Sequence, residues 1–166
     1  MERKTEIEIL KNAILLERQG QAFYSSVAKE TQSNAVKKIF SLMAGEEEKH
    51  INYLSKHFKN IQEKGYFVSD NNYDNPENVA KNVLSDEIKK EINAASYEAA
   101  AISAAIEMEK KAVELYAGRS EESDDSSEKE LYSMLAEWER THLEFLAGIQ
   151  KDLTEEIWYE NSFWPF

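Results

Sequence analysis

Residues 47–50, Glu-Glu-Lys-His, and residues 139–142, Glu-Arg-Thr-His, decide the fold of this 166-residue chain. In each stretch a glutamate is followed three positions later by a histidine, and a further glutamate stands thirty positions before the stretch begins. The second set repeats the first with an offset of 92 positions. The six repeated residues are Glu17, Glu47, His50, Glu109, Glu139 and His142. Two glutamates on separate helices and two Glu-x-x-His pairs are typical of a dinuclear metal site inside a four-helix bundle.

The similarity between the two halves extends beyond these six residues. Residues 13–14 (Ala-Ile) align with residues 105–106 (Ala-Ile) at the same offset. Tyr24 aligns with Tyr116, and each tyrosine stands seven residues after the first glutamate of its half. Because internal similarity indicates a repeated structural unit, the chain is predicted to contain two equivalent helical hairpins.

Helical periodicity of apolar residues runs through most of the chain. Ser33 is a favourable N-cap residue, and Gly65 is a residue type that commonly ends a helix. Neither proline, Pro76 or Pro165, interrupts a segment with helical periodicity. Four helices are therefore expected, over about residues 5–31, 33–63, 96–120 and 126–153.

These helices predict a single all-α domain, residues 1–166, built as a four-helix bundle with a long crossover. An unstructured loop of about thirty residues is uncommon in a compact domain, so one or two short helices are expected in the crossover. The crossover could instead pass a hairpin to a second chain, which would produce a domain-swapped homodimer. The C-terminal residues are expected to form a short helix or a tail, and their aromatic side chains are expected to cap one bundle end or to form a dimer contact. The expected order is hairpin one (about 4–63), crossover (about 64–95), hairpin two (about 96–153) and aromatic tail (154–166).

The repeated pattern has the chemistry of a metal site. Glutamate and histidine three positions apart lie on one face of a helix, so each pair can offer an oxygen and a nitrogen to the same ion. Four carboxylates balance the charge of two divalent ions, whereas without metal most of them would have to be protonated. Mixed carboxylate and imidazole ligands suit iron or manganese. Bridging carboxylates would hold the two ions roughly 3.5–4 Å apart.

Two tyrosines are candidates for a role near this site. Tyr24 and Tyr116 share a helix face with the first glutamate of each half, so they are expected to hydrogen-bond to ligand carboxylates. A redox role for either tyrosine is the alternative, although buried tyrosines commonly need a hydrogen-bond partner for structural reasons alone. His57, the remaining histidine, is expected to be structural or partly exposed and not a ligand.

Composition excludes several classes of protein. Asp and Glu number 32 against 20 Lys and Arg, which gives a formal charge of −12, so neither nucleic acid nor an anionic membrane surface is an expected partner. The chain has no cysteine, which excludes disulfides, zinc-thiolate sites and iron–sulfur centres and suits a cytoplasmic protein. No secretion signal or membrane span is expected, since the chain lacks a sufficiently long apolar run.

The motifs resemble the rubrerythrin-like branch of the ferritin-like superfamily. The stretches that carry the resemblance are residues 13–17, 47–50, 105–109 and 139–142, and the aromatic ending is also similar. The resemblance implies a non-haem di-iron site that reacts with hydrogen peroxide or dioxygen. Two features depart from rubrerythrin itself: the chain has no cysteines for a rubredoxin domain, and Ala112 occupies the position of an additional glutamate that belongs to the peroxidases.

Two functions remain open on these grounds. The first is an oxidoreductase, in which two iron ions reduce peroxide or dioxygen with electrons from an external donor protein. In this hypothesis Glu17 and Glu109 are terminal ligands, and Glu47 and Glu139 bridge the ions. His50 and His142 each bind one ion, and manganese or a mixed iron–manganese pair is an alternative occupant. The second function is an iron-binding or ferroxidase-type protein without catalytic peroxide turnover. A third, weaker hypothesis is a bundle in which the metals are structural or absent.

Overall fold

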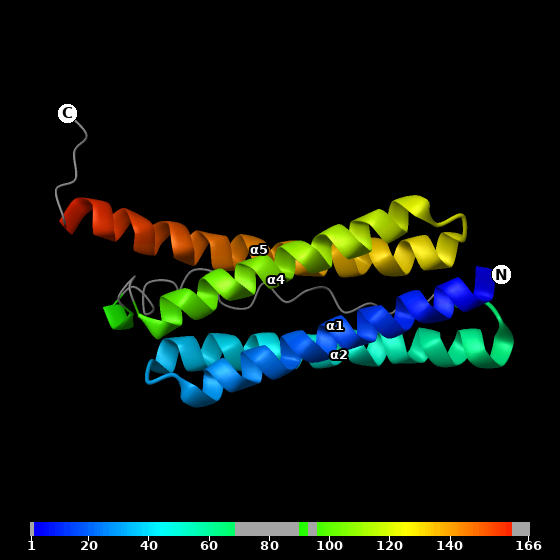
Figure 1. The fold of residues 1–166 in the computed structure, drawn as a ribbon, viewed down its shortest axis with the longest axis horizontal. Helices are drawn as coiled ribbons and strands as arrows, with labels where there is room; N and C mark the ends of the chain where they lie inside the picture. Colours follow the sequence, from blue (N-terminus) through cyan, green and yellow to red (C-terminus); the bar gives the residue numbers. More distant parts are fainter. Residues whose placement is uncertain (1, 69–89, 93–95, 161–166) are drawn as a thin grey trace.

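Four long helices form the fold (Figure 1), and the computed structural model describes residues 2–68, 90–92 and 96–160. The described residues contain no strand. The prediction of an all-α four-helix bundle made of two hairpins is therefore confirmed. None of the described helices is long and apolar enough to cross a membrane. The helices are α1 (Glu2–Glu30), α2 (Asn34–Lys64), α4 (Tyr97–Glu122) and α5 (Ser126–Glu160).

The helices pair in chain order, α1 with α2 and α4 with α5. α2 ends and α4 begins at opposite ends of the bundle (Figure 1), so a tight turn could not connect the two hairpins. The short helices predicted for the crossover fall largely on residues 69–89 and 93–95, which lie outside the described residues. The domain-swapped homodimer stays a prediction.

Local hydrogen bonds fix the helix ends near the predicted positions. Ser33 and Ser96 cap α2 and α4, and each side-chain oxygen accepts a backbone N–H three residues later, at 3.1 and 3.3 Å. The Asp125 carboxylate accepts two backbone N–H groups at the start of α5, at 2.8 and 2.9 Å. Gly65 ends α2 with a φ of 83°, a left-handed conformation that glycine adopts without steric cost.

The last helix is longer than its periodicity predicts. α5 continues to Glu160, whereas the sequence was expected to leave the helix near Leu153. Residues 154–160 contain no glycine or proline to end a helix, and Thr154 hydrogen-bonds back to the carbonyl of Gln150 at 2.8 Å. Trp158 and Tyr159 are therefore part of the helix, and the final residues, 161–166, lie outside the described part.

The apolar core consists of two clusters, one toward each end of the bundle. One cluster includes Tyr24 from α1, Phe40 from α2 and Leu146 from α5. The other includes Leu54 from α2 and Tyr116 from α4. All of these side chains are fully or almost fully buried. The middle of the bundle, between the two clusters, is where the repeated glutamates and histidines lie.

Gly65→Ala should lower the free energy of unfolding by about 1 kcal/mol, because alanine is strained in the left-handed conformation. Gly148→Ala is the matched control, since Gly148 lies within α5 and, apart from the adjacent backbone of its own helix, an added Cβ would meet no atom of the described residues within 4 Å. This control should be neutral or stabilising by up to about 1 kcal/mol. Urea denaturation followed by circular dichroism measures both, and equal effects of the two substitutions would contradict the assignment of Gly65 as the helix-ending residue.

Candidate metal centre

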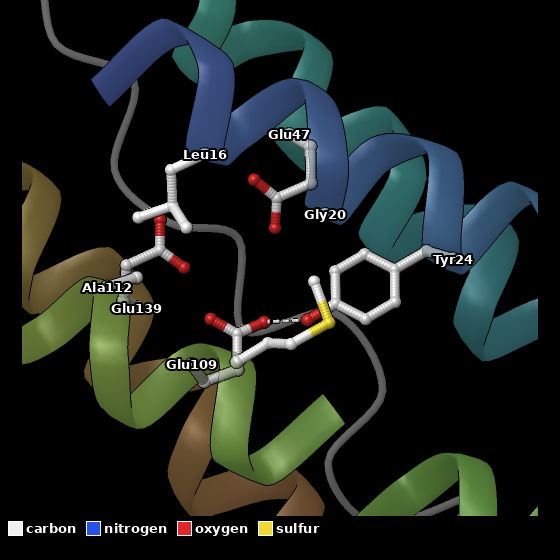
Figure 2. A pocket seen from close by; sticks show the side chains of 8 residues that line it. Leu16, Gly20, Tyr24, Glu47, Glu109, Ala112 and Glu139 are labelled. Carbon is white, nitrogen blue, oxygen red and sulfur yellow. Dashed lines mark hydrogen bonds between the residues drawn. The ribbon is translucent and has the colours of Figure 1, made fainter. Parts of the chain in front are cut away.

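The structure brings all six repeated residues together at the centre of the bundle. α1 and α4 each supply one glutamate, and α2 and α5 each supply one Glu-x-x-His pair. Five of the six are buried, and the sixth, His142, is 12% exposed. Carboxylates of Glu47, Glu109 and Glu139 face a common space between the helices (Figure 2).

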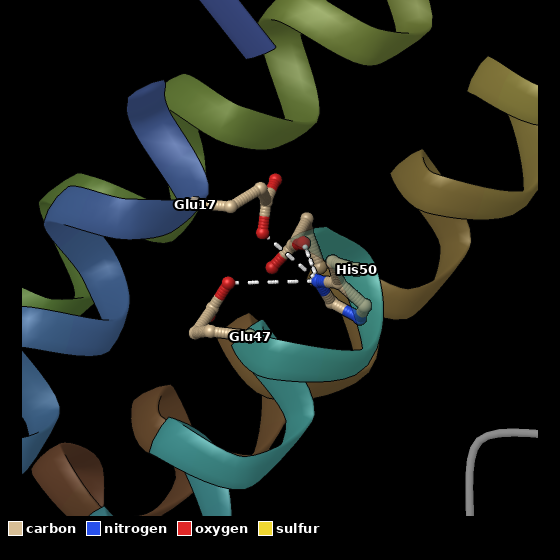
Figure 3. A group of neighbouring side chains, drawn as sticks. Glu17, Glu47 and His50 are labelled. Atoms are coloured by element: carbon tan, nitrogen blue, oxygen red, sulfur yellow. Dashed lines mark hydrogen bonds and ion pairs between the residues drawn. The ribbon is translucent and has the colours of Figure 1, made fainter. Parts of the chain in front are cut away.

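Three carboxylates surround the ring of His50, and together with it they form one group of four candidate ligands. Nδ1 of His50 lies 2.8 Å from Oε1 of Glu139, 3.0 Å from Oε2 of Glu17 and 3.5 Å from Oε2 of Glu47. These carboxylates come from α5, α1 and α2, so three helices converge on one nitrogen (Figure 3). Ligand atoms of all four residues lie within 4.8 Å of one another.

His142 and three carboxylates form a second group of four candidate ligands. Its Nδ1 lies 3.3 Å from Oε2 of Glu139 and 3.5 Å from Oε1 of Glu109. Glu47 completes the group within the same 4.8 Å limit. Glu47 and Glu139 therefore belong to both groups, whereas each remaining glutamate and histidine belongs to one.

Several buried polar atoms at the centre of the site face one another without forming hydrogen bonds. Both carboxylate oxygens of Glu139 and Nδ1 of His142 are buried and, within the described part of the chain, have no hydrogen-bond partner. The contacts from Glu139 to the two histidines have ion-pair distances without hydrogen-bond geometry. Buried polar atoms normally have a partner, so a bound cation fits this arrangement. The donor set of carboxylates and imidazoles is compatible with a di-iron site.

Burial and neighbouring charges shift the pKa values of Glu47, Glu109, Glu139 and the two histidines. Burial, together with the charge of Glu139, raises the pKa of Glu47 well above its usual range and that of Glu109 to about 8. Burial alone would also raise the pKa of Glu139, but His50 and His142 hold it well below its usual value. Burial disfavours charge on both histidines, yet the surrounding carboxylates raise the pKa of each imidazole well above normal. Glu139 therefore stays ionised more readily than Glu47 or Glu109.

Two tyrosines bond to the glutamates, and each bond crosses between the hairpins. The hydroxyl of Tyr24 on α1 donates to Glu109 on α4, and that of Tyr116 on α4 donates to Glu17 on α1. The expected hydrogen bonds are therefore present. Each tyrosine bonds to the glutamate of the other half, although each shares a helix face with the glutamate of its own half. Burial and the adjacent carboxylate raise the pKa of both phenols, so both remain protonated donors.

A small pocket adjoins the carboxylates on the α1 and α4 side (Figure 2). Its volume of about 20 Å³ can hold a molecule the size of water. Gly20 and Ala112 line it from α1 and α4, and they are also 92 positions apart. A Cβ added at Gly20 would lie 3.3 Å from Cδ of Glu47. Small residues at matched positions therefore leave the space beside the carboxylates.

Sequence reasoning missed the pocket and the crossing of the tyrosine bonds. Gly20 and Ala112 are small residues at matched positions, 92 residues apart, and this match could have indicated the pocket. The tyrosine hydrogen bonds between the hairpins depend on how the hairpins dock, which the sequence pattern does not show. His57 lies outside both groups of candidate ligands, as expected. It is buried and not partly exposed, and its ring centroid is 5.9 Å from that of Phe67.

Comparison with known proteins agrees with this geometry. A protein-family model described as Rubrerythrin matches residues 8–150, which include all six repeated residues and most of the four helices. None of the curated proteins or solved structures compared with the chain matches it. The matched residues make up well over half of the chain. The chain therefore belongs to the rubrerythrin family.

Proposed function

We propose that the protein binds two iron ions and uses them to reduce hydrogen peroxide or dioxygen with electrons from an external donor. The observation that carries this proposal is the pair of overlapping groups that share Glu47 and Glu139. The shared carboxylates would bridge the ions. The remaining members of the two groups would complete the two metal positions. Glu17 and His50 would complete one position, and Glu109 and His142 would complete the other.

The protein supplies the setting for this chemistry. When bound, two ferrous ions supply the two electrons that, with two protons, convert one hydrogen peroxide to two water molecules. Four carboxylates offset the charge of the ions in a site that is almost closed to solvent. Tyr24 and Tyr116 hold the two terminal glutamates by hydrogen bonds. The pocket beside Gly20 and Ala112 has room for an oxidant of about the size of water.

Ala112 favours a second candidate function. The family resemblance associates the additional glutamate at this position with peroxidase activity, and the methyl group of Ala112 lines the pocket instead. An iron-binding or ferroxidase-type protein would need the two metal positions but not repeated peroxide turnover. Many cycles of peroxide reduction with an added electron donor would support the oxidoreductase, whereas iron uptake beyond two per chain would support the alternative.

Several properties remain predictions from the sequence. Manganese or a mixed pair is an alternative to iron, because the same ligands suit it. The electron donor is expected to be a separate protein, since the chain has no cysteine for a rubredoxin-type centre. The homodimer and the cytoplasmic location also stay predictions.

Metal content tests the proposal most directly. Protein loaded anaerobically with ferrous iron and then desalted should hold about two iron ions per chain, and Glu47→Ala/Glu139→Ala should hold almost none. The double variant removes both shared carboxylates, so both positions are lost together. Elemental analysis measures the metal. The matched control is Glu48→Ala/Glu137→Ala, which removes two exposed neighbouring carboxylates and should keep both ions.

Little iron in the wild-type protein would contradict the proposal. A double variant that keeps two iron ions per chain would show that metal binds elsewhere and would refute the ligand assignment. Two ions that do not react with peroxide or dioxygen would leave the metal site intact but reject the oxidoreductase.

Metal binding should release protons and strengthen as pH rises. In the metal-free site the pKa of Glu109 is raised to about 8 and that of Glu47 is raised well above its usual range, so a metal that binds at lower pH must displace protons from these carboxyl groups. Each proton displaced should raise the apparent affinity about tenfold per pH unit. Titration with Mn²⁺ in weakly buffered solution containing a pH indicator measures the release. Glu107→Gln, at an exposed carboxylate of α4, is the control and should release as many protons as wild type. An affinity independent of pH would contradict the shifts.

Gly20→Ala should weaken metal binding without destabilising the helix. Alanine favours a helix interior by about 1 kcal/mol over glycine, so the metal-free protein should melt no lower than wild type. The added Cβ would crowd Glu47, which could shift in the metal-free protein but would be held in place by bound ions. Iron affinity should fall about tenfold. At Gly45, also within a helix, an added Cβ would meet no atom within 4 Å in the described part of the chain beyond its own helix backbone, so Gly45→Ala should keep full affinity. Equal affinities of the two variants would show that the space at Gly20 is not needed.

A further inference from the structure

The two halves of the site differ at the residue that precedes each Glu-x-x-His pair. Trp138 precedes Glu139 on α5, and at the matched position Glu46 precedes Glu47 on α2. The six repeated residues are identical between the halves, so this difference changes the surroundings of an otherwise duplicated site. A large aromatic ring in one half corresponds to a charged, flexible side chain in the other.

Trp138 covers His50. The indole stacks on the imidazole with ring centroids 4.8 Å apart and an interplanar angle of 18°. Trp138 is itself only 6% exposed, and Tyr53 contacts it with ring centroids 5.4 Å apart. His50 has no exposed surface. The imidazole therefore cannot turn toward solvent unless Trp138 moves first.

Among the residues that the structure describes, no tryptophan stacks on His142 as Trp138 does on His50. Glu46 pairs with Lys49 at 3.0 Å, and both side chains are partly exposed to solvent. The side chain of His142 is 12% exposed, against none for His50, although the two rings stack 5.8 Å apart at 21°. One imidazole thus borders solvent and the other is enclosed in the packed interior.

Release of a metal ion from several protein ligands proceeds as ligands detach one after another. A histidine on the solvent side can detach and admit a water molecule or a chelator, whereas a histidine under a stacked indole must first displace close-packed neighbours. The two positions should therefore differ in the rate at which metal leaves, even though their ligand types are the same.

We infer that the metal ion at the Glu109/His142 position exchanges readily with solvent, whereas the ion at the Glu17/His50 position is released slowly. Trp138 is the positioning residue that slows this release. This inference rests on the proposed two-metal function and goes beyond it by assigning different exchange rates to the two positions. Trp138 would act by holding His50 in place, not by touching the metal.

Metal release tests the inference without measuring activity. Protein loaded anaerobically with two ferrous ions is mixed with excess chromogenic ferrous chelator, and the colour is followed in time. Wild type should lose one ion per chain in each of two phases, with rates that differ about tenfold or more.

Trp138→Ala should accelerate the slow phase about tenfold. Trp138→Phe should keep it slow, because phenylalanine preserves the aromatic stack, and Glu46→Gln should leave both phases unchanged.

Two variants identify the positions independently of Trp138. His142→Gln should abolish the fast phase and leave one slowly released ion, whereas His50→Gln should abolish the slow phase. Circular dichroism establishes that each variant keeps its helical content. Fewer than two ions per chain in wild type would reject the two-metal proposal and the inference together. Two ions that leave in a single phase, the reverse assignment, or a slow phase unaffected by Trp138→Ala would overturn the inference alone.

Discussion

The burial of four carboxylates at the centre of one bundle is the constraint on which the rest of the structure depends. Glu17, Glu47, Glu109 and Glu139 are each 3% exposed or less, and ionised carboxylates are poorly solvated at such a position. Histidines, tyrosine hydroxyls and a bound cation are the groups that can offset that cost there. The helices must therefore hold all of these groups in register at one level of the bundle, and the apolar residues pack above and below that level.

The duplication makes each hairpin incomplete by itself. Each half contains two glutamates, a histidine and a tyrosine, but the tyrosine hydroxyl bonds to a glutamate of the opposite half. Both groups of candidate ligands also draw residues from both hairpins. Docking of the hairpins and assembly of the site are thus one event, in which apolar contacts and polar contacts depend on each other.

Much of this arrangement could be predicted from the sequence because it is local or repeated. Glu and His three apart share a helix face whatever the tertiary structure, and Ser33 and Gly65 mark helix ends by their own chemistry. The end of α5 was misplaced because residues 154–160 carry no breaker and helical periodicity fades before the helix does. The crossed tyrosine bonds and the stacking of Trp138 on His50 depend on the docking of two hairpins, which no local pattern records.

The division of the apolar core has a consequence for how the protein opens. Because most apolar contacts lie toward both ends and the polar residues lie between them, the ends gain more stability from apolar packing than the middle does. Bound metal would hold the helices together at this middle level. It would also stabilise the folded state, because it would bind the folded chain and not the unfolded one. In its absence, the backbone amides of the central turns would exchange with solvent sooner than those nearer the helix ends, the reverse of the fraying expected for helices.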